Sequence, residues 1–372
     1  MVERKDIRDP DNRILSLDFF RGCVMLLLIG EAAGVYDLLV APALEGSILY
    51  SIGLQFQHHP WNGLHVWDLG QPLFMFISGA AMVFSYNKRW TLGMLWRETF
   101  IHALTRSLLL FFLGWAIYRI EPVPGSPCGA FLYDIFPQLA VGGLVAFLVL
   151  KWPIPKQLGL AFGLIVVTEI LYRLWSVPGF EGPFVPGRNF GSYVDRIIMG
   201  SVSEDNWVAF NMVPAAAFMI WGAVAGRFLK EPGTAARRIR VLFLAGCGGV
   251  AAGLALSSVT PVIRRINTSS FVILCGGFCL LSLALACWLM EVLKVRKPAV
   301  PFLAVGMNPL LIYLFAQTGG AAWLEQVVAP FSIGLFGWGG EWLAEFATSI
   351  ATLGLMVALC YWLYRKKIFV KI

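Results

Sequence analysis

Long apolar stretches alternate with short polar ones along the whole chain. Each apolar stretch is close to the length, about 20 residues, that a helix needs to cross the apolar core of a bilayer. These stretches are residues 14–33, 66–86, 100–118, 131–150, 158–175, 207–228, 241–258, 271–290, 300–316 and 341–363. The pattern therefore predicts an all-α, polytopic integral membrane bundle with about ten transmembrane helices.

Composition agrees with this prediction, because the 372 residues are 58% hydrophobic and only 14% charged.

The distribution of basic residues predicts the orientation of the bundle in the membrane. One set of connections and ends carries Arg4, Lys5, Arg8, Arg13, Lys88, Arg89, Arg97, Lys151, Lys156, the cluster 227–240, Lys294, Arg296, Lys297, Arg365, Lys366 and Lys367; the other set carries only Arg119, Arg173, Arg188, Arg196, Arg264 and Arg265. The positive-inside rule therefore predicts that both termini are cytoplasmic. Because these charges are spread over separate loops, nucleic-acid binding is excluded, and the lipid bilayer is the expected partner.

Sequence features outside the spans indicate one membrane domain, residues 1–372, with external loops 35–65, 176–206 and 317–340. The last of these is apolar and glycine-rich, so a re-entrant turn is expected there.

The charged stretch 1–13 precedes a first span without a cleavage site, so this span should stay in the membrane as an anchor. A bacterial inner membrane suits the predicted topology. Cys128 alone lies in an external loop, so no disulfide framework is expected.

Three of the four histidines lie together at the end of the first external loop. His58, His59 and His65 precede Asp68, which opens the second span. Imidazole moves protons near neutral pH, and a carboxylate within reach fixes its tautomer. His58 or His59, with Asp68 or Glu31, is therefore a candidate acid–base pair. Zinc binding by the three histidines and Asp68 is an alternative, although no familiar ligand spacing appears, and interfacial histidines without a chemical role are another.

Two polar groups inside the spans have simpler interpretations. Asp18 and Arg21 are three residues apart, so they can pair on one face of the first helix. This pair either ties down a helix end or belongs to a ligand site. His102 stands alone in the third span and is interpreted as a packed or hydrogen-bonded helix residue.

Several motifs in colinear order resemble the heparan-alpha-glucosaminide N-acetyltransferase family and its bacterial relatives. They begin with Arg13-x-x-Ser16-x-Asp18-x-Phe20-Arg21-Gly22 and His58-x-Pro60-Trp61-Asn62-Gly63-Leu64 with Asp68 and Pro72. They continue with Arg106-Ser107-Leu108-Leu109 and Gly114, Gln138, Tyr193-Val194-Asp195-Arg196 with Gly200, Gly222 with Ala225-Gly226, Gly306-Met307-Asn308 with Tyr313, and Tyr364-Arg365-Lys366-Lys367-Ile368-Phe369. The matches cover nearly the whole chain.

The resemblance implies that an acetyl group passes from cytoplasmic acetyl-CoA to a sugar or glycan outside, with His58 as general base or acyl carrier. The expected catalytic residues are His58, Asp68 and Glu31. The expected acceptor-binding residues are Trp61, Asn62, Gln71, Asp195, Arg196 and Asn308. Asp18, Arg21, Arg106, Gln138, Lys366 and Lys367 are expected to contact acetyl-CoA, and no metal is expected. The assembly hypothesis is a homodimer.

Two positions depart from the family pattern. Animal members have an asparagine in the first span near the position of Glu31, and Gln-Arg where this chain has Gln138-Leu139. The heparan substrate is not carried over, because a membrane core does not specify a glycan. Two rival functions stay open: a proton-coupled transporter or flippase for a glycan or lipid precursor, and a membrane subunit that has lost activity.

Overall fold

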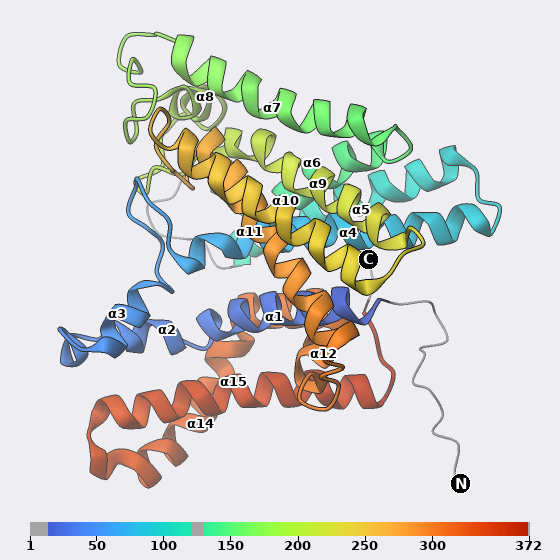
Figure 1. Ribbon diagram of the computed structural model, residues 1–372. Coiled ribbons are helices and arrows are strands. Elements are labelled where there is room, and N and C mark those ends of the chain that lie inside the picture. Colours follow the sequence, from blue (N-terminus) through green and yellow to red (C-terminus); the bar gives the residue numbers. More distant parts are fainter. Residues whose placement is uncertain (1–13, 121–128, 371–372) are drawn as a thin grey trace, which may run out of the picture.

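The computed structural model describes residues 14–120 and 129–370, and every regular element in these ranges is a helix (Figure 1). Arg4, Lys5, Arg8, Arg13 and Cys128 lie outside the described residues. The α-helices are α1 (Leu15–Ala32), α2 (Val35–Leu39), α3 (Ile48–Leu54), α4 (Gly70–Thr91), α5 (Trp96–Ile120), α6 (Ile135–Val149), α7 (Ile154–Leu174), α8 (Phe190–Met199), α9 (Met212–Lys230), α10 (Ala235–Leu256), α11 (Ser269–Cys287), α12 (Val300–Met307), α13 (Pro309–Phe315), α14 (Ala321–Phe336) and α15 (Glu341–Arg365). The short helix η2 (Val66–Leu69) precedes α4 and carries Asp68.

The helices form two packed groups (Figure 1). Helices α4 to α11 make one group, and α1 lies between it and α12 to α15. The backbones of α1 and α12 approach closely at two glycines. A Cβ at Gly22 would overlap the carbonyl oxygen of Phe302, and a Cβ at Gly306 would overlap that of Asp18. Small residues permit such close helix packing in membranes, so these two glycines allow α1 to pack directly against α12.

Seven helices of the described chain are long and apolar enough to cross a membrane, and an eighth is obtained if the bent pair from Val300 to Gly339 is one span. The protein is therefore a multi-pass integral membrane protein. Each of the ten predicted segments contains a helix, but three differ from a simple span. Helix α6 has only 15 residues, α1 carries Asp18, Arg21 and Glu31 within 18 residues, and α12 ends after eight residues at an 80° bend. The count of ten spans stays a prediction.

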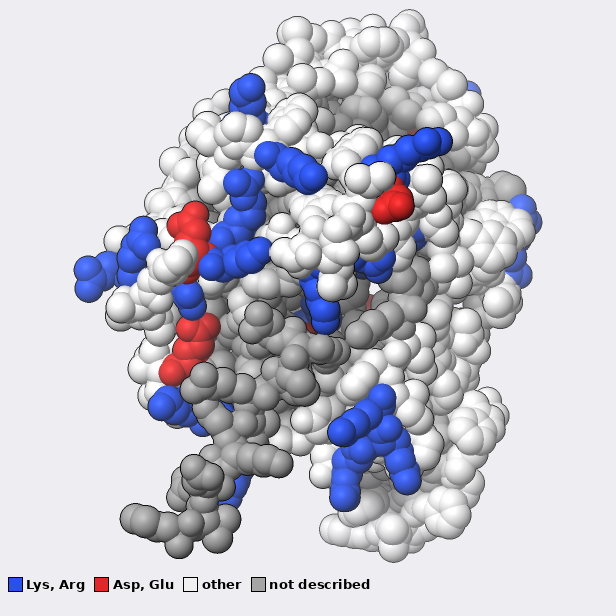
Figure 2. Space-filling model, turned by 90° about the vertical axis from the view of Figure 1, so that its right-hand side faces the viewer, with Lys and Arg blue, Asp and Glu red and all other residues white. Residues whose placement is uncertain are grey.

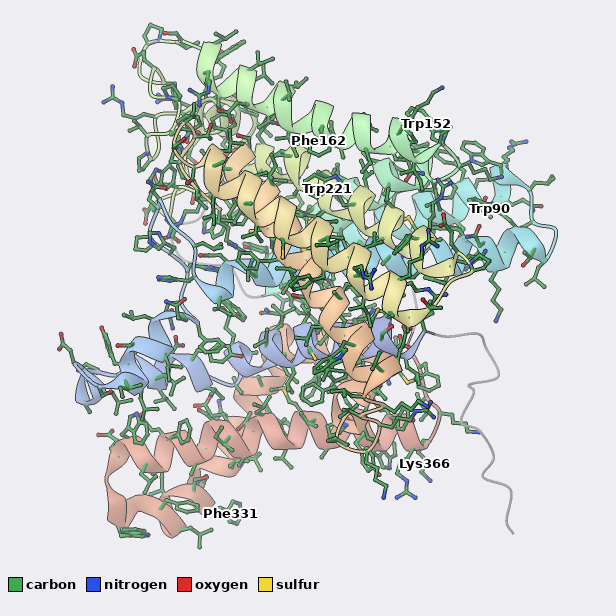
Figure 3. All side chains as sticks on the ribbon, viewed as in Figure 1. Trp90, Trp152, Phe162, Trp221, Phe331 and Lys366 are labelled. Atoms are coloured by element: carbon green, nitrogen blue, oxygen red, sulfur yellow. The ribbon has the colours of Figure 1, made fainter. Side chains whose placement is uncertain are left out.

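The expected external loops contain helices. Residues 35–65 include α2 and α3, and residues 176–206 include α8. Residues 317–340 differ most from the expected loop, because α14 occupies most of that segment. A break at Gly319, where φ is +83°, separates α14 from α13. The apolar side chains of α14 face outward, as the 70% exposure of Phe331 illustrates (Figure 3).

The two ends of the bundle differ in charge. The connections α4–α5, α6–α7, α9–α10 and α11–α12 meet at one end with the C-terminal end of α15, and we call this end the basic face (Figure 1). Figure 2 shows it, with Lys and Arg side chains spread over it and few acidic ones. The opposite end, which we call the histidine face, carries residues 33–69, the α7–α9 connection and the α10–α11 connection.

Candidate functional site

Asp68 organises the histidine loop. Its side chain is almost fully buried, and its Oδ2 accepts hydrogen bonds from the backbone N–H of His65 at 2.9 Å and of His59 at 3.3 Å. A second tie joins the two ends of the loop, since the N–H of Trp67 donates to the carbonyl of Gln55 at 2.9 Å. The carboxylate therefore sets the path of the chain around the histidines before α4 begins.

The other oxygen of Asp68 holds the imidazole of His58. Oδ1 lies 3.0 Å from Nδ1 of His58, whose side chain is one-third exposed. Because an ionised carboxylate only accepts hydrogen bonds, Nδ1 carries the hydrogen and Nε2 keeps its lone pair. This is the arrangement that proton abstraction by Nε2 requires. Of the pairs that the sequence left open, the structure forms His58 with Asp68.

The other two histidines have different surroundings. Nδ1 of His65 donates to the carbonyl of Gln57 at 2.9 Å, and the ring of His59 packs edge-on against that of His65 at 4.8 Å. Gly63 leaves room for His59, because a Cβ there would overlap the imidazole. The three rings thus do not converge on one point. No group of three or more His, Cys, Asp or Glu side chains suited to a metal ion occurs in residues 14–120 and 129–370.

An arginine from the α10–α11 connection completes the cluster. Nε of Arg264 lies 3.7 Å from Oδ1 of Asp68, and its guanidinium lies 4.5 Å from the ring centre of Trp207. The same indole contacts His58 edge-on at 5.6 Å. Burial lowers the pKa of Arg264 to about 10, and the carboxylates of Asp68 and Glu31 oppose that shift. Glu31, at the end of α1, therefore faces the cluster through Arg264.

Burial and the Arg264 charge together lower the pKa of His58 to about 4, against the opposing effect of Asp68. An imidazole with that pKa is neutral at pH 7. The lone pair on its Nε2 is therefore available at physiological pH.

Two residues expected to bind acceptor hold the histidine loop in place. Oδ1 of Asn62 accepts from the N–H of Val262 at 3.0 Å, and the N–H of Gly63 donates to the carbonyl of Val262 at 2.8 Å. Nε1 of Trp61 donates to the carbonyl of Phe184 at 2.8 Å. These hydrogen bonds attach the loop to the α10–α11 connection and to the α7–α9 connection.

The structure does not bring the other expected acceptor residues to His58 by any described contact. Gln71 is buried, and its amide lies 3.9 Å from Sδ of Met75. Asp195 is fully buried and accepts from the N–H of Ala209 at 3.1 Å, while Arg196 is exposed. Asn308 lies at the bend after α12, and its amide bonds the backbone of Ile368 and Val370 near the basic face. Asp195 and Asn308 thus hold backbone segments, and acceptor binding by these four residues stays a prediction.

A cavity of about 850 Å³ lies between the two helix groups and extends to the basic face. Asp18, Arg21 and Arg106, three of the expected donor contacts, line it. Lys88, Arg89 and His102 also line it, and the last of these was interpreted from the sequence as a packed residue. Its inner wall is apolar and includes Leu28, Phe74, Phe136, Leu139 and Tyr313. The cavity thus has a cationic outer part and an apolar inner part.

The three remaining expected donor contacts are not among the residues that line this cavity. Nε2 of the buried Gln138 donates to the carbonyl of Tyr133 and to Oδ1 of Asn211. Lys366 and Lys367 are exposed, and Lys366 projects outward beyond the end of α15 (Figure 3). The family resemblance grouped these three residues with the other donor contacts, and their role in donor binding stays a prediction.

Arg264 is the site residue that sequence reasoning missed as a member of the cluster. Its only signal was the Arg264-Arg265 pair in a connection expected to be poor in basic residues. The two arginines are 196 positions or more beyond Asp68, so no local spacing links them.

Comparison with known proteins gives two distant relatives. The chain is 24% identical to heparan-alpha-glucosaminide N-acetyltransferase of Homo sapiens, over 97% of the chain and 60% of that protein. It is 23% identical to the protein of the same name from Mus musculus, over 98% of the chain and 61% of that protein. No family model matches. The chain is therefore distantly related to these transferases, and it spans about 60% of their length.

Proposed function

We propose that the protein is a membrane acyltransferase that moves an acetyl or related acyl group from acyl-CoA to an amino or hydroxyl group of a sugar or glycan. The observation that carries this proposal is the His58–Asp68 pair, at the 3.0 Å separation that orients a base. The relationship to two proteins named as N-acetyltransferases supports it. The acceptor is left as a sugar class, because the relatives' names describe only the relatives.

The cavity at the basic face suits the donor. Acyl-CoA carries several phosphate charges, which Arg and Lys bind by charge-assisted hydrogen bonds. Arg21, Arg89 and Arg106 supply guanidinium groups on three helices, and the apolar inner wall suits the acyl chain and its linker. Leu139, where the animal members carry arginine, belongs to this wall. The thioester end would therefore point toward the start of α4, next to Asp68.

The chemistry at His58 needs only its free nitrogen. Nε2 takes the proton from the acceptor's N–H or O–H as that atom attacks the thioester carbonyl. The new C–N or C–O bond forms, the C–S bond breaks, and the sulfur leaves with the bonding electron pair as a thiolate. The imidazolium then returns its proton to the thiolate, which gives free CoA. Asp68 stabilises the imidazolium while it exists.

The same proposal gives the protein a direction in the membrane. The excess of Lys and Arg on the basic face supports a cytoplasmic position for that face by the positive-inside rule, and acyl-CoA is available there. The histidine face then lies outside, with the acceptor, and a bacterial inner membrane suits this arrangement. The histidine loop would act at the outer end of a passage that starts at the cytoplasmic cavity.

Purified protein in lipid nanodiscs tests the activity directly. It is incubated with labelled acetyl-CoA and a panel of amino sugars and envelope glycans, and products are identified by mass spectrometry. We expect acetylation of at least one acceptor and release of one CoA per acetyl group. Absence of both transfer and binding of any acyl-CoA would contradict the proposal, and proton-coupled sugar uptake by the same protein in vesicles would favour a transporter.

Arg106→Gln is expected to weaken acetyl-CoA binding by about tenfold, because a hydrogen bond to a charged group contributes about 1.5–3 kcal/mol. Isothermal titration calorimetry with acetyl-CoA measures this change. The matched control is Lys156→Gln, which removes an exposed charge from the same face outside the cavity. Equal affinity in wild type and Arg106→Gln would mean that the donor binds elsewhere.

A further inference from the structure

Arg264 is a buried charge that the transfer chemistry does not use directly. Its side chain is only 14% exposed, and Nε and Nη1 are buried without a hydrogen-bond partner among the described residues. The nearest carboxylate oxygen, Oδ1 of Asp68, is 3.7 Å from Nε and so beyond a good hydrogen bond. Burying a guanidinium without full hydrogen bonding is costly, which calls for a reason for its position.

The groups around Arg264 come from separate parts of the fold. Asp68 from η2 and Glu31 from α1 attract its positive charge, and Arg265 from the same connection repels it. The indole of Trp207 lies against the guanidinium at 4.5 Å. His58 shares both Asp68 and Trp207 with Arg264. The imidazole and the guanidinium therefore face one carboxylate and one indole.

The connection that carries Arg264 is held firmly. Oγ1 of Thr268 donates to the carbonyl of Pro261 at 2.7 Å and accepts from the N–H of Ile263 at 3.0 Å. The same connection is tied to α7, because Glu169 accepts from Oγ1 of Thr260 at 2.7 Å and from Oγ of Ser269 at 2.8 Å. The position of Arg264 is thus built into the fold.

We propose that Arg264 is a positioning residue that keeps the Asp68 carboxylate ionised against Nδ1 and keeps the His58 imidazole neutral, as a base ready to act. Two positive charges this close repel, so an imidazolium beside Arg264 is disfavoured and its proton passes readily to the leaving thiolate. The carboxylate of Glu31 also attracts the guanidinium. The catalytic consequence rests on the proposed acyl transfer, but the electrostatic arrangement does not.

The first test is the pH dependence of kcat/KM in wild type, Arg264→Gln and Arg264→Lys. The low pKa of His58 predicts a wild-type profile that is nearly level between pH 5 and 8. Without the positive charge, the pKa of His58 should rise from about 4 toward the ordinary histidine value but stay below it, because burial still lowers it. Arg264→Gln should therefore lose a few-fold in kcat/KM at pH 5.5 and very little at pH 8. Arg264→Lys should restore most of the level profile. Arg188→Gln, an exposed arginine paired with Glu181 on the same face, is the control and should match wild type.

The second test measures the protonation of His58 directly, without acyl transfer. Nitrogen-15 NMR of histidine-labelled protein in nanodiscs, with His58→Asn to assign the signal, gives the midpoint of the His58 titration. We expect the midpoint to rise in Arg264→Gln and to return toward wild type in Arg264→Lys. An unchanged midpoint, or a kcat/KM loss that is equal at every pH and not rescued by lysine, overturns the proposal. A raised midpoint in a protein that transfers no acyl group would instead refute only the acyltransferase function.

Discussion

Replacing His58 with alanine is expected to lower kcat for acyl transfer by about a thousandfold. Among the described histidines of the loop, only His58 has its Nδ1 hydrogen-bonded to a buried carboxylate, which leaves its Nε2 free to act as the base. Without it, the acceptor must lose its proton to solvent while it attacks the thioester. The measurement is steady-state transfer of labelled acetyl to the best acceptor from the panel, with acetyl-CoA varied at saturating acceptor.

Affinity for acetyl-CoA should be nearly unchanged in His58→Ala, because His58 is not among the residues that line the donor cavity. His59→Ala is the matched control, since that ring packs against His65 rather than Asp68, and it should keep kcat within a few-fold of wild type. If His58→Ala turns over at close to the wild-type rate, His58 is not the base. If His59→Ala instead loses activity to the same extent, the assignment within the loop is wrong.

Asp68→Asn should be as damaging as the loss of the imidazole, with a decrease in kcat of about 10³- to 10⁴-fold. The amide oxygen of asparagine can still accept the N–H groups of His59 and His65, which leaves its NH₂ group facing Nδ1 of His58. Nδ1 must then accept, so the hydrogen moves to Nε2 and the base is blocked. The substitution also removes the charge beside Arg264.

The kinetic signature separates this tautomer effect from unfolding. Asp68→Asn should elute as a monodisperse protein, bind acetyl-CoA with wild-type affinity and lose kcat. Asp37→Asn, an exposed carboxylate on the same face that accepts from the amide of Gln57, is the control and should retain activity. A variant at Asp68 that transfers acetyl within tenfold of wild type would show that the tautomer of His58 does not limit the reaction.

The sequence predicts the helices well because their signal is local. Runs of apolar residues near 20 in length predict each long helix, and breaks such as Gly319 appear where the chain changes direction. For segment 317–340 the sequence predicted a loop where the structure has a helix. Its glycines suggested a loop, but the apolar residues between them are sufficient for the 16 residues of α14.

The site residues that are close in sequence were likewise predicted, and the one that is distant in sequence was not. His58 and Asp68 are ten residues apart, so one loop and the start of one helix bring them together. Residue chemistry left His58 or His59 with Asp68 or Glu31 as candidate pairs, and the family resemblance singled out His58. Arg264 reaches them only through tertiary packing of the α10–α11 connection, which no spacing reveals. The contacts of two amides were likewise not readable from the sequence: Nε2 of Gln138 donates to Oδ1 of Asn211, and Nδ2 of Asn308 donates to the carbonyl of Ile368.

The most direct test of the central claim is transfer across a sealed membrane. Protein is reconstituted in vesicles with labelled acetyl-CoA outside and the acceptor enclosed, and vesicles in which the basic face points outward are selected by protease sensitivity of its loops. We predict labelled acceptor inside with unlabelled CoA outside, and neither with His58→Ala. Labelled acceptor only when both substrates share one side, or none in wild type, would contradict the proposal that the cavity and His58 serve one reaction from opposite faces.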